Sequence, residues 1–168
     1  MTVSPSLRLG MLLLSLLAAS PAFALEPGNA VPKLSAPGRD GKPVTLDQFR
    51  GQVVYVDFWA SWCAPCHEAM PALDTLYRRY RERGFVVLGV NVDSDRIPAQ
   101  RMLDRIAPSF PAVFDPQGEW PQAFGLRVMP SAYLIDAKGM IRYIKSGYRS
   151  QDLPQLEATI KAALEESQ

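Results

Sequence analysis

The feature that most constrains the fold is a β-branched and aromatic run, Val53–Trp59, which leads within a few residues into a helical pattern. Runs of this kind form strands that are buried on both faces of a sheet. Beyond Cys63, apolar residues such as Met70 and Leu73 return at spacings of three and four, which is the period of a helix packed on one side. The chain is therefore expected to bury a strand and to pack the following helix against it.

The remaining patterns alternate strands and helices and then end in a hairpin and a last helix. The expected elements are an irregular hairpin at 34–36 and 43–45, a helical turn at 46–49, strands at 85–92 and 112–114, helices at 98–106 and 120–126, paired strands at 132–135 and 140–145, and a helix after residue 150. Asp95 or Ser94 is available to cap the second helix, and Ser150 the last one. This order predicts an α/β domain in which a central mixed sheet carries helices on both faces.

Residues 1–24 are predicted to be a secretory signal peptide and not part of the fold. A single charge, Arg8, precedes an unbroken apolar and small run at 9–19, and small residues stand at the −3 and −1 positions of a cut after Ala24. A retained membrane anchor is the alternative, but as a helix the run spans only about half of a bilayer core. We expect export to the periplasm, cleavage, and one mature domain at 25–168.

Length and charge place further bounds on this domain. Removing 24 of the 168 residues leaves 144, which is enough for one domain with a complete core. The chain has 18 basic and 17 acidic side chains, and the loss of Arg8 leaves the two kinds in balance. A neutral domain has no net electrostatic attraction for nucleic acid or for an anionic membrane surface. We expect a monomer that binds no nucleic acid.

Cys63 and Cys66, the two cysteines of the chain, stand three residues apart where the strand gives way to the helix. A loop this small gains little stability from closure, so the pair is interpreted as redox chemistry. Unpaired N–H groups and the dipole at a helix N-terminus stabilise a thiolate, which makes Cys63 the expected attacking sulfur. Pro65 suits the first helical turn. Cys66 is expected to be less exposed and to resolve the mixed disulfide.

Asp57 is the candidate proton acceptor for Cys66. It lies six residues before Cys63 in a run whose other members are apolar. A buried Asp without a charged partner has a raised pKa, which suits it to accept a thiol proton near neutral pH. The alternative is that Asp57 lies at a strand end and binds backbone groups or water. The strand pattern alone leaves both interpretations open.

The segment from Asp57 to Cys66, DFWASWCAPC, closely resembles the active-site segment of thioredoxins. Pro71 matches the kink proline of their active-site helix, and Val128-Met129-Pro130-Ser131 resembles their cis-proline loop. Over about residues 27–165 the chain is similar to the extracytoplasmic TlpA/ResA-like thioredoxins. The shared segments are 46–51, 114–118 and 133–139, together with an N-terminal β-hairpin and a central insertion before the cis-proline. The resemblance implies a thioredoxin-like fold and supports Asp57 as the proton acceptor.

The resemblance also implies roles beyond the cysteines. A cis Pro130 packs beside the disulfide and leaves the backbone of Met129 free to pair with an extended substrate. Trp62 shields Cys66 and offers an apolar contact, unless it is a buried core residue; Trp59 is expected in the core. The implied substrates are disulfide-bearing proteins, and the implied electron source is a membrane carrier of the CcdA or DsbD type. The family favours a reductase that needs no cofactor and no metal.

Two departures from the family bear on a role in cytochrome c maturation. Many members that serve this process carry a Glu three residues after the second Cys, where this chain has Ala69; Glu68 is expected to point elsewhere. Such members often lack the strand acid that this chain has in Asp57. The acid–base groups therefore resemble those of ordinary thioredoxin, which weakens the case for a role dedicated to apocytochrome c.

Other classes of protein also fit parts of the sequence. Cys63, Cys66 and His67 satisfy the attachment pattern of a c-type haem, with His67 as the proximal ligand. Two thiolates and one His do not complete a tetrahedral zinc site within one chain. A non-catalytic binding module with a vestigial cysteine pair is a further alternative. The strand, the acid and the distal proline fit the redox interpretation better than any of these.

Overall fold

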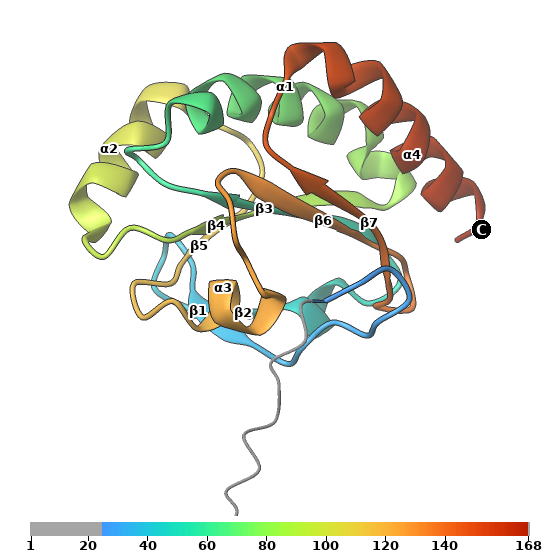
Figure 1. Cartoon of the computed structure of the whole chain (residues 1–168), viewed down its shortest axis with the longest axis horizontal. Helices are drawn as coiled ribbons and strands as arrows, with labels where there is room; N and C mark the ends of the chain where they lie inside the picture. Colours follow the sequence, from blue (N-terminus) through green and yellow to red (C-terminus); the bar gives the residue numbers. More distant parts are fainter. Residues whose placement is uncertain (1–24, 168) are drawn as a thin grey trace, which may run out of the picture.

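A five-stranded mixed sheet organises the computed structural model, which describes residues 25–167. The strand order is β5-β4-β3-β6-β7 (Figure 1). The strands are β3 (Val53–Trp59), β4 (Phe85–Asn91), β5 (Ala112–Phe114), β6 (Ser131–Ile135) and β7 (Ile141–Ser146). β3, β4 and β5 run parallel, whereas β6 is antiparallel to β3 and β7 is antiparallel to β6. The predicted α/β architecture with a central mixed sheet is confirmed.

Helices cover both faces of this sheet, as expected (Figure 1). One face carries α1 (Ala64–Tyr80), α2 (Arg96–Ile106) and α4 (Leu153–Glu165). The other face carries the predicted N-terminal hairpin of β1 (Ser35–Pro37) and β2 (Pro43–Thr45), the 3-10 turn η1 (Leu46–Phe49) and α3 (Glu119–Phe124). Between β4 and β6 the chain inserts α2, β5 and α3, and β5 becomes an edge strand.

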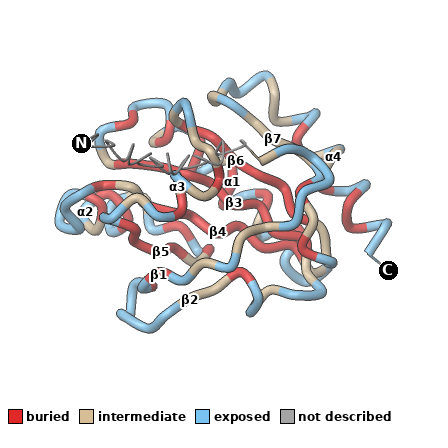
Figure 2. The backbone as a smooth tube through the Cα atoms, turned by 60° about the horizontal axis from the view of Figure 1, so that its bottom comes forward, coloured by how far each residue is buried: buried red, intermediate tan, exposed pale blue. Residues whose placement is uncertain are grey.

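β3 is the centre of the core, and every one of its residues is buried (Figure 2). Alternate side chains of a strand point to opposite faces of the sheet. Tyr55 and Trp59 accordingly pack in the same cluster as α1 and α4, and Val56 and Phe58 pack in the cluster on the α3 side. The apolar composition of the run is therefore explained by layers on both sides of the strand.

The helix boundaries follow the predictions closely, with one correction. Asp95 caps α2, and its side chain accepts a hydrogen bond from the N–H of Ile97. Ser150 does not cap the last helix: it begins a 3-10 turn, η3 (Ser150–Asp152), and Asp152 is the cap residue of α4. The expected capping serine was wrong because this extra turn shifts the start of α4 to Leu153.

The predicted signal peptide lies outside the residues that the structure describes. Within 25–167, none of the helices is both long and apolar enough to cross a bilayer.

Candidate active site

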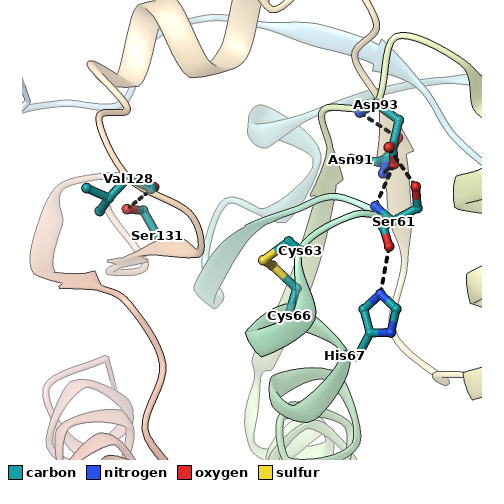
Figure 3. Close-up of a disulfide and its surroundings, with 8 residues drawn as sticks. All are labelled: Ser61, Cys63, Cys66, His67, Asn91, Asp93, Val128 and Ser131. Atoms are coloured by element: carbon teal, nitrogen blue, oxygen red, sulfur yellow. Dashed lines mark hydrogen bonds between the residues drawn. A yellow bond between two sulfur atoms is a disulfide. The ribbon is translucent and has the colours of Figure 1, made fainter.

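The cysteine pair lies just after β3, at the start of α1, and it forms a disulfide (Figure 3). The Cα atoms of Cys63 and Cys66 are 5.3 Å apart. Cys63 is the N-cap residue of α1, and Pro65 stands in the first turn, where its missing N–H leaves no helical bond unmade. Both cysteine residues are buried, and Cys66 is the more deeply buried of the two. This placement puts Cys63 against the N-terminal dipole of α1 and makes it the less deeply buried of the two cysteines.

Asp57 lies in β3 on the face of the sheet that packs against α1. It has the same strand parity as Tyr55 and Trp59, which share a core cluster with both cysteines. Ala69, one helical turn beyond Cys66, lines the same cavity as Asp57. The carboxyl is buried, and among the described residues its Oδ2 has no hydrogen-bond partner. Burial alone raises its pKa from 3.8 to about 8.

The loop before the cysteines is held by a network that the sequence analysis did not identify. Asp93 Oδ2 accepts from the N–H of Ser61 at 2.8 Å, and Asp93 Oδ1 accepts from the Ser61 hydroxyl at 2.8 Å. Asn91 Nδ2 donates to Asp93 Oδ2 at 2.6 Å (Figure 3). Asn91 is the last residue of β4 and Asp93 follows it closely, at the same end of the sheet where β3 ends, because the two strands run parallel. Because parallel strands end at the same edge of a sheet, the residues at the end of the second predicted strand could have been identified from the sequence as neighbours of the cysteine loop.

His67 belongs to the same network. Its Nε2 lies 2.8 Å from the carbonyl oxygen of Ser61. A carbonyl only accepts, so this nitrogen carries the hydrogen. Within residues 25–167, no group of three or more His, Cys, Asp and Glu side chains is arranged to hold a metal ion. His67 thus helps to hold the loop before the cysteines in place through its contact with Ser61.

The proline loop lies across from the disulfide. The Met129–Pro130 peptide bond is cis, and the Ser131 hydroxyl donates to the carbonyl of Val128 at 2.9 Å (Figure 3). Pro130 is buried and lines the cavity that contains Asp57. Met129 is partly buried, and its backbone makes no hydrogen bond with the part of the chain that the structure describes.

The two tryptophans of the motif differ in burial. Trp59 is fully buried, as expected, and its ring fills the space above Gly89 of β4. Trp62 is 67% exposed, so the alternative that it is a core residue was wrong. An exposed indole next to the redox pair is available for contact with a partner. Glu68 is also exposed, on the side of α1 that faces Tyr148.

Together, the fold and the site define a thiol-disulfide oxidoreductase of the thioredoxin-like class. A family model described as Redoxin matches residues 26–160. The thiol-disulfide oxidoreductase ResA of Geobacillus thermodenitrificans is 31% identical over 82% of this chain and 80% of its own length. A structure assigned as the thiol:disulfide interchange protein DsbE of Chlorobium tepidum is 38% identical, has a TM-score of 0.82, and matches 84% of this chain and 99% of its own. This chain belongs to the TlpA/ResA-like thioredoxin family.

The comparisons establish the class of activity of this chain. Its relatives are named thiol-disulfide oxidoreductases, and it retains an adjacent cysteine pair in a thioredoxin-like fold. It is therefore a thiol-disulfide oxidoreductase that acts on disulfide-bearing proteins.

Proposed function

We propose that this protein is a periplasmic reductase of protein disulfides, monomeric, exported by a signal peptide at residues 1–24. One observation carries the mechanism: the disulfide stands at the N-terminus of α1, on the same face of the sheet as the buried Asp57 carboxyl, which has no charged partner among residues 25–167. The first position favours a thiolate, and the second favours an acid that exchanges its proton near neutral pH. Export rests on the sequence pattern of the first 24 residues.

The first step is attack by the Cys63 thiolate on a disulfide of the substrate. A bond forms between Cys63 Sγ and one substrate sulfur, and the other leaves as a thiolate. Cys66 then gives its proton to the Asp57 carboxylate and attacks Cys63 Sγ, which releases the second substrate thiolate. The substrate gains two electrons, and the enzyme is left with the Cys63–Cys66 disulfide.

Three groups are proposed to hold the substrate. Trp62 offers an exposed apolar contact beside Cys63. The backbone groups of Met129 make no hydrogen bond within residues 25–167, and they are proposed to pair with an extended peptide in the manner of an added strand. Pro130 stands between that peptide and the cavity of Asp57. A membrane carrier of the CcdA or DsbD type is proposed to restore the dithiol.

The residue Ala69 bears on the choice of substrate. Family members that serve cytochrome c maturation often carry Glu at this position, and here Ala69 lines the cavity of Asp57. The acid in this space therefore comes from β3 and not from α1. We favour general reduction of protein disulfides over service dedicated to apocytochrome c.

Replacing each cysteine tests the proposed roles. Cys63→Ser is expected to abolish disulfide exchange, because no thiolate remains to attack. Cys66→Ser is expected to accumulate mixed disulfides through Cys63, which non-reducing electrophoresis and mass spectrometry detect. Turnover by Cys66→Ser together with trapping by Cys63→Ser would reverse the assignment.

The redox potential and the redox state in cells test the direction of electron flow. A reductase has a potential near that of thioredoxin and is found mainly as the dithiol in cells. A disulfide form that predominates in cells, with a potential near that of the strong oxidants, would contradict a reductase. For localisation, the N-terminus of protein recovered from the periplasm is expected to be Leu25; full-length chain recovered only from membranes would contradict cleavage.

A further inference from the structure

The proposed cycle leaves Asp57 with a proton that must reach solvent before the next turnover. Asp57 is buried, and its Oδ2 lacks a hydrogen-bond partner among residues 25–167. On the β4 side its register partner is Gly89, and the side-chain atoms nearest to the space above this glycine belong to the rings of Trp59 and Phe110. The route toward β4 is therefore closed by packed side chains.

The other side of Asp57 is open. In the sheet, Asp57 pairs with Ala132 of β6, and Ala132 pairs with Lys145 of β7. Residues in one such row project from the same face, so the carboxyl and the lysine are separated by a single methyl group. A cavity occupies this space and is lined by Asp57, Ala132 and Lys145. The volume open to water is about 20 Å³, which is enough for about one water molecule.

The polar groups of this cavity differ in their exposure to solvent. Lys145 is in an ion pair with Asp152, and their side chains are 17% and 23% exposed. Arg149 lies 3.2 Å from the same carboxylate and is 68% exposed. The ionisable groups that line the cavity with Asp57 are Tyr55, Lys145, Tyr148, Arg149 and Asp152. The helices contribute apolar residues, Ala69 and Leu73 from α1 and Leu153 and Leu156 from α4.

We propose that Lys145 is a positioning residue for the redox reaction: with Asp152 it forms the polar mouth of a one-water passage between Asp57 and solvent. After Asp57 has taken the proton of Cys66, its Oδ2 donates that proton to the water in the cavity, and the water passes a proton to bulk water at the Lys145–Asp152 pair. This inference rests on the proposed role of Asp57 in the reaction.

The test compares Lys145→Met with Arg142→Met, since both remove a β7 cation that pairs with an acid, and Arg142 lies outside the cavity. Stopped-flow kinetics measure attack by Cys63 and resolution by Cys66 across pH. Lys145→Met is expected to slow resolution about tenfold near pH 7, part of the roughly 10²-fold that positioned proton transfer contributes, and to leave attack unchanged. Arg142→Met is expected to change neither step. Equal rates in the two variants would overturn the proposal.

A double substitution separates this proposal from the one that it rests on. In an Asp57→Asn background, Lys145→Met is expected to have no further effect, because the carboxyl whose proton leaves through the passage is absent. If Asp57→Asn alone left resolution unchanged, the proposed function of Asp57 would fail. If Asp57→Asn slowed resolution and Lys145→Met still added its tenfold loss, the passage alone would be refuted.

A second variant tests the passage without touching any charge. Ala132→Val adds methyl groups between Asp57 and Lys145, and it is expected to slow resolution as Lys145→Met does. Cooperative unfolding of the Ala132→Val protein would show that the domain is folded. Normal resolution in a folded Ala132→Val protein would contradict a route through this cavity.

Discussion

Two buried aspartates flank the segment that carries the cysteines, and their surroundings are opposite. Asp57 is 3% exposed and Asp93 is 6% exposed, so burial does not distinguish them. Asp93 accepts hydrogen bonds from the backbone and hydroxyl of Ser61 and from Asn91. Asp57 Oδ2 has no partner in the described part of the chain. Three hydrogen-bond donors therefore face the Asp93 carboxylate, whereas desolvation of the Asp57 carboxyl raises its pKa to about 8.

The difference shows how one residue type takes two roles within one site. A carboxylate with well-placed donors holds its neighbours in a fixed geometry. A carboxyl without donors costs stability when it is charged, and that cost makes it able to exchange a proton near neutral pH. The hydrogen-bond partners of each aspartate, more than its burial, therefore distinguish the two roles: Asp93 is structural, and Asp57 is the proposed proton acceptor.

The largest expected effect is on the stability of Asp57→Asn in the disulfide form. The pKa of Asp57 is raised from 3.8 to about 8 in the folded protein, so the folded state holds its proton more tightly than the unfolded state does. Wild-type stability is then expected to fall as pH rises from about 4 to about 8, by roughly 4 kcal/mol between pH 5 and pH 8. The Asn side chain does not titrate, so the stability of the variant relative to wild type is expected to increase as pH rises.

Urea unfolding at several pH values measures this gain. Asp93→Asn is the matched control: it also replaces a buried carboxylate by an amide, but it removes an acceptor that three donors use, and it is expected to be less stable than wild type. A constant difference between Asp57→Asn and wild type from pH 5 to pH 8 would show that the two aspartates do not differ in this way.

The next effect is on kinetics. Asp57→Asn is expected to slow resolution by Cys66 about 10²-fold near neutral pH and to affect attack by Cys63 much less. Mixed disulfides then persist longer, and stopped-flow measurement of the two steps detects this. Asp93→Asn is expected to change both steps together, because it loosens the loop that carries Cys63. Unchanged resolution in a folded Asp57→Asn protein would make this carboxyl structural, like Asp93.

A smaller effect is expected on the stability of Asp93→Asn. The amide keeps the shape of the side chain, but it turns one acceptor toward Ser61 into a donor and removes the charge. We expect a loss of about 1–3 kcal/mol. Ser61→Ala, which removes only the hydroxyl bond, is expected to lose about 1 kcal/mol. A smaller loss in Asp93→Asn than in Ser61→Ala would contradict the role of Asp93 as the anchor of the loop.

The sequence predicts the elements well because their signals are local. The run at Val53–Trp59 and the periodicity beyond Cys63 each lie within one segment, and the structure contains both elements. Asp93 and Lys145 were missed because the register of other strands brings them to the site. The exposure of Trp62 was likewise left open, since composition does not reveal which way a loop side chain turns.

The smallest expected effect is that of His67, which contacts the same residue as Asp93 from the opposite side. Its Nε2 donates to the Ser61 carbonyl, and both the neutral and the charged imidazole keep this hydrogen. His67→Ala is expected to lose about 0.5–1 kcal/mol of stability and less than about twofold in either kinetic step. His67→Gln supplies another N–H donor and is the matched control. If Asp93 is the main anchor of the loop, His67→Ala perturbs it less than Asp93→Asn does, because a carboxylate with three donors contributes more than one neutral bond. A larger loss of activity in His67→Ala than in Asp93→Asn would place the main support of the loop on α1 and would overturn the comparison between the two aspartates.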